Sequence, residues 1–420
     1  MKSPAVAFGE PIPGRWLVVA LLWFVACFNF MARLMITTMH GSVMAAIPMS
    51  EAQFGLLTAV FLWGYGFLSP WAGFLSDRFS RSRVIAFSML AWSAVTWLTA
   101  YARTFEQLIA MRVAMSLCEA SYMPAALALI SEYHRGATRA LATGLHMSGA
   151  VLGCALAGLG GWLAERHSWH YAFSMIGAVG VGYGIVLVLA LRDAPREDHR
   201  SSEEQPSAAL ASREPKVGFL RAMKSLLGHL PYLHFLTYVI LMGTVGLVVN
   251  SWMPTYVMEH FHMAQGAAGL AAAAYQNVPG LLGLFVGGAW ADRWSRSSPR
   301  GYVYVTVVGL LLAVPGILFA SQSPIFALAM VGLMLYGFGV EFGDATQMPI
   351  ICQIVDSRYR ATAYGTMNFV QQITGGFAVY ATGLLRDLRI ETSSILLGAA
   401  GVQVLGSGML LLLKPRKRVR

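Results

Sequence analysis

Charged side chains are scarce in this 420-residue chain. Asp, Glu, Lys and Arg make up only 12% of the residues, whereas soluble domains carry roughly 25%. Hydrophobic residues account for 56%. A composition so poor in charge argues against an ordinary soluble enzyme or binding domain, because too few polar residues remain to cover its surface. It indicates an integral membrane protein.

Cysteine is also scarce, and the motifs of ATP-driven and metal-dependent enzymes are missing. The four cysteines fall inside apolar stretches and lack the spacing of metal ligands: Cys27, Cys118, Cys154 and Cys352. Neither a Gly-Lys phosphate-binding loop nor His-Glu-x-x-His occurs. We therefore expect no enzyme activity, no metal and no cofactor. The energy source is then a coupling ion, either a proton or sodium.

Apolar stretches of about 20 residues are long enough to cross ~30 Å of hydrocarbon as helices. The sequence contains twelve, near residues 16–38, 51–75, 84–102, 106–131, 139–163, 171–191, 232–257, 265–290, 302–320, 325–352, 361–385 and 393–413. The first lacks a small-residue cleavage site and is expected to remain as a span. The fold prediction is an all-α membrane protein of twelve transmembrane helices.

The net charge of +10 follows from orientation rather than from nucleic-acid binding. With both termini in the cytoplasm, the inner segments hold 24 of the 30 Lys and Arg residues, and the outer loops hold only four. This asymmetry is the positive-inside rule. It predicts a multi-pass protein of a bacterial-type inner membrane, with membrane lipids and a small-molecule substrate as partners. We expect a monomer that binds no nucleic acid.

A motif occurs twice, 215 residues apart. Gly73-Phe-Leu-Ser-Asp77-Arg78-Phe-Ser-Arg81 and Gly288-Ala-Trp-Ala-Asp292-Arg293-Trp-Ser-Arg296 each place a glycine at the inner end of a span, followed by charges. The small residue permits close helix approach, and the charges can link helix ends. We expect a gate on the cytoplasmic side, formed by Asp77, Arg78, Arg81, Asp292 and Arg293, with partners near 135–139 or at the start of the eleventh span.

A second repeated segment supports an internal duplication. Arg139-Ala-Leu-Ala-Thr-Gly144 opens the fifth span, and Arg360-Ala-Thr-Ala-Tyr-Gly365 opens the eleventh, 221 residues later. The sequence predicts two pseudo-symmetric six-helix halves, residues 1–192 and 232–420, with the binding site between them. A polar cytoplasmic linker, 193–231, joins them, and its 217–230 part is expected to lie on the membrane surface as a helix.

These features resemble the major facilitator superfamily of secondary transporters over nearly the whole chain. Within it, the chain is similar to the anion:cation symporters of sugar acids and related organic anions. The residues that carry this second resemblance are Arg33, Gln53-Phe-Gly55, Trp63-Gly-Tyr65, Arg112 with Glu119, Asn250-Ser-Trp252-Met-Pro254-Thr-Tyr256, and Asn368 with Gly375-Gly376. The family usually has an acid immediately before Arg33, where this chain has Ala32. The resemblance implies alternating access.

Charges inside spans cost a few kcal/mol each on insertion scales, so each is a functional candidate. Arg33 can grip a carboxylate through two hydrogen bonds, and its alternative is a lock to a helix end or to Glu119. Arg112 and Glu119, seven residues apart, share one helix face. We predict substrate binding by Arg33 and Arg112 and proton coupling by Glu119. The alternative is a permanent Arg112–Glu119 pair that pins the helix.

Two further acids, Glu341 and Asp344, lie three residues apart in the tenth span. They can supply a proton site or bind a cation, and they argue against a simple anion site. Polar amides in the second half suit the recognition of substrate hydroxyl groups or, alternatively, the packing of helices against one another. We predict substrate contacts from Tyr65, Asn250, Gln276, Asn277, Asn368 and Gln372.

The leading functional hypothesis is proton-coupled symport of a small organic anion such as a sugar acid. The three cavity acids favour an alternative, which is an exporter of amphipathic, lipid-like or cationic compounds. A third reading is a non-transporting membrane receptor. Saturable binding without counterflow in vesicles would distinguish the receptor from both kinds of transporter.

Overall fold

The computed structural model describes residues 14–134, 138–194, 219–356 and 359–413. Side chains at 70, 72–78, 140, 219–222 and 361 are outside the description. Within the described residues the first half contains α1 (Arg15–Leu34), η1 (Met35–Met39), α2 (His40–Ala46), α3 (Glu51–Arg78), α4 (Arg81–Thr99), α5 (Phe105–Glu119), α6 (Tyr122–Tyr133), α7 (Arg139–Leu156), α8 (Gly158–Arg166) and α9 (Trp169–Ala190).

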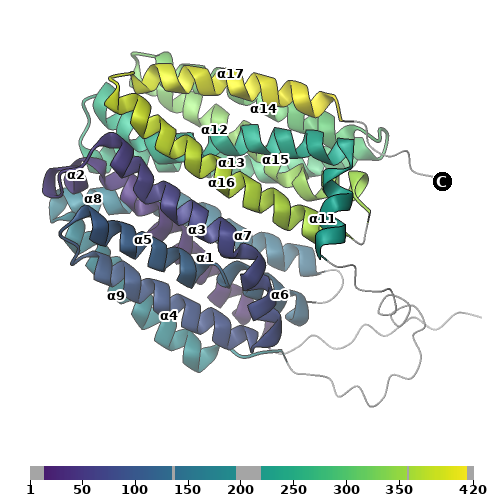
Figure 1. The fold of residues 1–420 in the computed structure, drawn as a ribbon, viewed down its shortest axis with the longest axis horizontal. Helices are drawn as coiled ribbons and strands as arrows, with labels where there is room; N and C mark the ends of the chain where they lie inside the picture. The colour runs from purple at the N-terminus through teal and green to yellow at the C-terminus, as the bar shows by residue number, and fades with distance from the viewer. Residues whose placement is uncertain (1–13, 135–137, 195–218, 357–358, 414–420) are drawn as a thin grey trace, which may run out of the picture.

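The second half begins with a short amphipathic helix, α11 (Phe219–Leu227), and continues with six long ones. These are α12 (Leu230–His260), α13 (Gln265–Ser295), α14 (Gly301–Gln322), α15 (Phe326–Ile354), α16 (Arg360–Asp387) and α17 (Thr392–Leu411). Figure 1 shows the two halves as separate bundles that lie side by side, with α3 and α16 running along the boundary.

Three of the expected single spans are interrupted helices. The span predicted at 106–131 breaks between α5 and α6, because Pro124 has no amide hydrogen and its ring would clash with the carbonyl of Ala120 in a continuous helix. The break between α7 and α8 falls at Ala157, whose carbonyl accepts a hydrogen bond from Thr38 Oγ1 at 3.1 Å. The first span changes from α1 through the 3-10 turn η1 into α2.

Counting each interrupted pair once, the described residues form twelve long helical rods, which confirms the all-α, twelve-helix prediction. Ten rods are long and apolar enough to cross a membrane. The other two are α4, which contains several serines and threonines, and α16, which carries Asn368, Gln371 and Gln372. Both pack along other rods, so packing holds them in the bundle despite their lower hydropathy.

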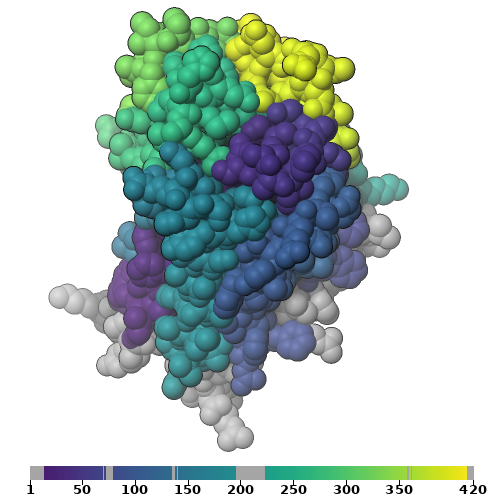
Figure 2. Space-filling model, turned by 90° about the vertical axis from the view of Figure 1, so that its left-hand side faces the viewer, coloured from purple at the N-terminus to yellow at the C-terminus, as the bar shows by residue number. Residues whose placement is uncertain are grey.

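The two ends of the bundle differ in how closely the halves approach. We call the end where α9 stops and α12 starts the linker end, and the other the closed end. At the closed end α3 meets α16 and α8 meets α13. Figure 2 looks onto this end and shows it filled, with the purple segment around α2 seated between the two halves. The two halves are therefore in direct contact at this end.

Candidate functional site

A charged cluster joins the two halves at the closed end. Arg386 on α16 donates two hydrogen bonds to Glu259, at 2.7 and 3.1 Å, and a third to Glu51 of the first half at 3.1 Å. His40 reaches the same Glu51 carboxylate at 2.9 Å. The Arg386 guanidinium also lies 5.1 Å from the centre of the Trp252 ring. We call these five residues the latch.

Asp387, next to the latch, caps α3 from the opposite half. Its two carboxylate oxygens accept hydrogen bonds from the backbone amides of Glu51 and Ala52, at 2.8 and 3.0 Å. A carboxylate is favoured there because the first amides of a helix have no partners within it and carry partial positive charge. The cap and the latch would both have to separate before the closed end could open.

Arg33 lies in the last turn of α1. It is close enough to Glu119 for an electrostatic interaction, but the two side chains do not form an ion pair. Its guanidinium carbon is 4.7 Å from the ring centre of Phe61 and 5.1 Å from that of Tyr65. Among the described residues no carboxylate forms an ion pair with it. An aromatic cradle holds the cation without neutralising it, so its hydrogen-bond donors remain available to an anion. Tyr65, also predicted as a contact, forms one wall of this cradle.

Arg112 is arranged differently from Arg33. Only 2% of its surface is exposed. Its Nε donates to the Leu57 carbonyl at 3.1 Å and its Nη2 to the Arg33 carbonyl at 3.2 Å. These bonds direct the guanidinium to the backbones of α3 and α1, so the pair with Glu119 considered from the sequence is not formed. The geometry of Arg112 suits a role in holding Arg33 in place.

Glu119 is buried, with 1% of its surface exposed. Asn29 on α1 faces it, yet both carboxylate oxygens and the Asn29 Nδ2 lack a hydrogen-bond partner. On α7, both ring nitrogens of the buried His146 also lack one. Native proteins satisfy most buried polar atoms, and a buried carboxylate without partners is costly in its charged form. Such a group can act by gaining and losing a proton.

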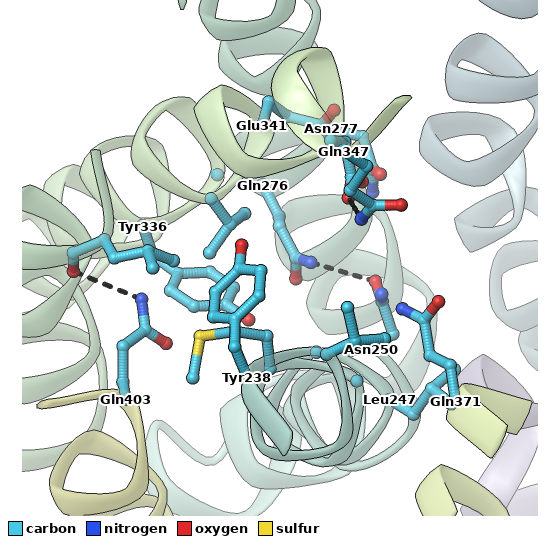
Figure 3. Close-up of a pocket in the computed structure, with 18 residues that line it drawn as sticks. Tyr238, Leu247, Asn250, Gln276, Asn277, Tyr336, Glu341, Gln347, Gln371 and Gln403 are labelled. Atoms are coloured by element: carbon cyan, nitrogen blue, oxygen red, sulfur yellow. Dashed lines mark hydrogen bonds between the residues drawn. The ribbon is translucent and has the colours of Figure 1, made fainter. Parts of the chain in front are cut away.

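The second half contains a cavity of about 170 Å³. Glu341 and Asp344 line it, together with three of the predicted amides, Asn250, Gln276 and Asn277. Figure 3 shows these amides gathered beside Glu341, with Gln276 donating to the Asn250 Oδ1 at 2.9 Å. Asp344 accepts a hydrogen bond from Gln347 at 2.6 Å. Two of the sequence-predicted acids and three of the predicted amides therefore share one cavity.

The cavity faces the first half. Asn250, Gln276 and Asn277 also line a crevice of about 20 Å³ whose other walls include Leu34 and Cys154. Cys154 lies close enough to both Arg33 and Glu341 for an electrostatic interaction with each. Tyr364 on α16 is similarly close to Tyr65 and to Asp344. A basic site of the first half and an acidic site of the second thus meet at the boundary between the halves.

Two other predicted contacts lie on α16, outside the lining of that cavity. Gln372 packs against Gly66 of α3, where an added Cβ would come within 2.9 Å of the Gln372 Cβ. Its neighbour along the same boundary, Trp63, donates to the Ile373 carbonyl at 3.1 Å. Asn368 is partly exposed. Gln372 therefore lies where the helices pack, as the alternative reading of the amides expected.

The gate motif is described only in part. The side chains of Asp77 and Arg78, and residues 135–137 of the expected partner segment 135–139, lie outside the described residues. Arg81 forms an ion pair with Glu132 inside the first half. In the second copy Asp292 accepts a hydrogen bond from Tyr302 at 3.0 Å, and Arg293 is exposed. The described contacts of this motif join helices within each half rather than the two halves.

Asp193 lies beside the first copy, beyond the end of α9. It accepts a hydrogen bond from the Ser82 amide at 2.8 Å. Burial by itself raises the pKa of its carboxyl, but the hydrogen bonds from Ser80 and Ser82 outweigh burial and hold the pKa below its usual value. Asp193 therefore remains charged and anchors the start of the linker to α4.

Sequence reasoning missed the latch and several cavity residues. Arg386 stood out only as one of four basic residues in the outer loops, and nothing in the sequence pairs it with Glu51, 335 positions away. In the cavity, Tyr238, Tyr336 and Gln403 were not identified. Gln403 alone carried a signal, because it is a polar residue inside an otherwise apolar span.

Comparisons with known proteins agree with this architecture. The family model described as Major Facilitator Superfamily matches residues 22–379. The chain is 25% identical to an MFS-type efflux pump of Mycolicibacterium smegmatis, covering 94% of this chain and 89% of the pump. It is 23% identical to a probable galactarate/D-glucarate transporter of Escherichia coli, covering 84% of each.

Among solved structures, the chain is similar to a bacterial homologue of the human lysosomal transporter Spinster in an inward-facing, unoccupied conformation. The TM-score is 0.76 and the identity is 21%, covering 96% of each chain. At this identity the likeness concerns the fold. One of the relatives named above is an efflux pump and the other is a probable transporter of sugar acids. The two names therefore suggest different substrates and different directions of transport.

Proposed function

Because this chain belongs to the major facilitator superfamily, and is therefore an integral membrane transporter rather than an enzyme, we propose that it is a proton-coupled symporter of a small organic anion such as a sugar acid. The observation that carries the proposal is Arg33, a cation held by aromatic rings and, among the described residues, in no ion pair with a carboxylate. Arg binds carboxylates through two parallel hydrogen bonds. The sugar-acid relative supports the same substrate class.

Glu119 supplies the proposed coupling site. It is on the same half as Arg33, buried and without hydrogen-bond partners. Binding of an anion at Arg33 adds negative charge near Glu119, which favours protonation of the carboxyl group. Departure of the anion favours release of the proton. Proton and anion then cross together, and the energy of the proton gradient drives uptake.

Alternating access requires the two halves to rock about the site between them. In this structure the latch and the Asp387 cap hold the closed end together. We propose that the closed end faces outward and the linker end faces the cytoplasm of a bacterial-type inner membrane, with both termini inside. The positive-inside asymmetry of the loops supports this orientation.

Uptake into proteoliposomes tests the proposal. Purified protein would be reconstituted and offered labelled galactarate, gluconate and simple monocarboxylates, with and without an inward proton gradient. We expect uptake of at least one acid, stimulated by the gradient and lost in Arg33→Ala. Arg33→Lys, which keeps the charge but loses the planar fork, should retain part of the uptake. Gradient-independent uptake would remove the coupling from the proposal, and uptake of only neutral or cationic compounds would overturn the anion substrate.

A second candidate is an exporter of amphipathic or cationic compounds. The specific observation in its favour is the acidic lining of the cavity by Glu341 and Asp344, and one relative is an efflux pump. This candidate predicts that Glu341→Gln or Asp344→Asn abolishes transport whereas Arg33→Ala is tolerated. The symporter predicts the opposite result for Arg33→Ala.

A further inference from the structure

The cavity of the second half is built from acceptors and aromatic rings. None of its lining residues is Lys, Arg or His, and two of them, Glu341 and Asp344, are acids. Tyr238 and Tyr336 are buried in its wall, with 3% and 1% of their surfaces exposed, and both lie close enough to Asp344 for an electrostatic interaction. Figure 3 shows both rings among the lining side chains.

Gln403 is a further acceptor, independent of the acids. Its side chain is 0% exposed, and its Nε2 donates to the Leu310 carbonyl at 3.3 Å. That bond determines which end of the amide is which, because only the NH₂ group can donate to a carbonyl. The Oε1 is then an acceptor, and it has no partner. In Figure 3 this oxygen lies on the side of the Gln403 amide that faces Tyr238.

These groups together suit an organic cation. An ammonium group offers hydrogen-bond donors or polarised C–H groups in several directions, and it is attracted both to carboxylates and to the faces of tyrosine rings. The cavity of about 170 Å³ exceeds several times the roughly 30 Å³ that a water molecule occupies in the liquid. It therefore has room for an ammonium group with its attached carbons.

We propose that this cavity binds an ammonium group of the substrate, with Glu341 and Asp344 as counter-ions and Tyr238, Tyr336 and Gln403 as further contacts. The substrate class is then an amino-substituted organic acid, whose carboxylate is bound by Arg33. This inference rests on the proposed anion transport for the carboxylate alone. The basic site of the first half and the acidic site of the second hold the two ends of one zwitterion and bring the halves together on it.

Proton binding by the two acids explains less of this lining. A proton taken up by Glu341 or Asp344 neutralises a charge, but it leaves the Gln403 Oε1 without a donor and gives the two tyrosine rings no ligand. An ammonium group accounts for the two acids, for the Gln403 Oε1 and for the tyrosine rings. It also accounts for the separation of the two acids from Glu119, which lies in the other half.

Equilibrium binding to purified full-length protein tests the proposal with three probes. D-Gluconate carries the carboxylate alone, 6-amino-6-deoxy-D-gluconate adds an ammonium group at the opposite end of the same skeleton, and choline carries the cation alone. We expect the amino analogue to bind at least about tenfold more tightly than gluconate, since hydrogen bonds between charged groups are worth more than those between neutral groups. Asp344→Asn and Glu341→Gln should remove this preference and leave gluconate binding intact.

One matched control and two variants of Gln403 accompany the acid variants. Glu106→Gln removes an acid at an exposed position at the start of α5, far from the cavity along the chain, and should keep the preference. Gln403→Glu adds a carboxylate at the unpartnered acceptor and should strengthen choline binding, whereas Gln403→Leu should weaken it. These two variants give the test a readout even if an acid variant fails to fold.

The outcomes separate this inference from the proposed function. Gluconate binding that depends on Arg33, with a preference unaffected by the cavity variants, overturns the ammonium site and leaves the anion transporter standing. Choline binding that depends on Asp344, with no gluconate binding, supports the ammonium site and overturns the anion proposal. Equal affinity of the wild-type protein for gluconate and its amino analogue overturns the ammonium site, and no binding of any probe overturns both.

Discussion

At the scale of single residues, the two arginines of the first half show how similar sequence signals lead to different environments. Both are charges inside predicted spans. Arg112 donates to two backbone carbonyls, whereas Arg33 lies on aromatic rings. A guanidinium bound to backbone carbonyls supports structure, and one without such bonds is able to bind a ligand. The two carbonyls that Arg112 binds belong to residues 55 and 79 positions away in the chain. The local sequence does not specify such neighbours.

Replacing Arg112 should therefore affect stability more than recognition. We expect Arg112→Met to remove the hydrogen bonds to the carbonyls of Leu57 and Arg33 and to destabilise the protein by about 1–3 kcal/mol per lost bond. Thermal unfolding of the purified variant in detergent measures this. Because Arg112 supports Arg33, substrate affinity should fall modestly. Full stability combined with complete loss of binding would instead make Arg112 a direct substrate ligand.

Glu119 should separate transport from its coupling to protons. Glu119→Gln resembles the protonated acid, so the loaded carrier can still reorient and we expect counterflow to be retained. Accumulation should be lost, because an inward gradient of about one pH unit supplies ~1.4 kcal/mol per proton only if the proton is released inside. Parallel vesicle assays measure both activities.

The control for this pair of assays is Glu106→Gln, an exposed acid on the same helix, which should leave both activities unchanged. Equal loss of counterflow and accumulation in Glu119→Gln would assign Glu119 a structural role. Full retention of both would move the coupling function to another acid, with Glu341 and Asp344 as the candidates.

At the scale of helices, glycines determine how closely α3 and α16 approach. Gly55 lies on α3, where an added Cβ would come within 2.9 Å of the Val379 carbonyl and 3.2 Å of the Trp252 ring. Toward the closed end, an added Cβ at Gly383 of α16 would collide with the Glu51 carbonyl. Small residues at such positions allow backbones to pack closely in a membrane. Their packing is needed only while this end is closed.

A bulky side chain at Gly55 should therefore work against closure. We expect Gly55→Leu to shift the protein toward states in which the closed end is open, because the wedge costs nothing once the halves have separated. Labelling of a single cysteine introduced at Ser42, in a cysteine-free background, reports this opening. Gly398→Leu on α17 is the matched control, since an added Cβ there meets nothing within 4 Å. Unchanged labelling in Gly55→Leu would contradict the prediction.

At the scale of the whole molecule, the latch and the substrate site affect the same equilibrium, that between a closed and an open arrangement of the two halves. The latch contacts exist while one end is closed, and substrate binding between the halves must compensate for their loss when that end opens. A ligand shifts such an equilibrium only by the difference between its affinities for the two states. In the proposed binding mode, Arg33 and the acidic cavity provide that difference, because sites in different halves can contact one substrate together only when the halves approach around it.

Weakening the latch should open the closed end without substrate. Of the hydrogen bonds that Arg386 donates to carboxylates, only the one to Glu51 joins the two halves. Loss of an interaction worth roughly 1–3 kcal/mol shifts the equilibrium about 5- to 150-fold. We expect Arg386→Gln to increase labelling at Ser42 and to protect a cysteine at Ser80. Arg389→Gln, at an exposed neighbour, should change neither. Loss of transport with unchanged labelling would rule out a gating role.

Much of this architecture is determined by the sequence alone. Hydropathy, charge asymmetry and two internal repeats specify a twelve-helix membrane protein with duplicated halves, because a bilayer permits few other ways to satisfy the backbone. The charges inside spans were also identifiable, since their insertion cost makes them rare. Hydropathy did not reveal the breaks at Ala120 and Ala157, which depend on one proline and on a hydrogen bond from a distant threonine.

Only the tertiary structure decided which of the rare polar groups act together. It placed Glu341 and Asp344 in one cavity with Tyr238, Tyr336 and Gln403, and it joined Arg386 to Glu51 across the two halves. These contacts link positions that are up to 335 residues apart, and no local pattern encodes such a distance. The cost of burying a polar group can be read from one position, whereas the partner that offsets this cost is determined by how the whole chain packs.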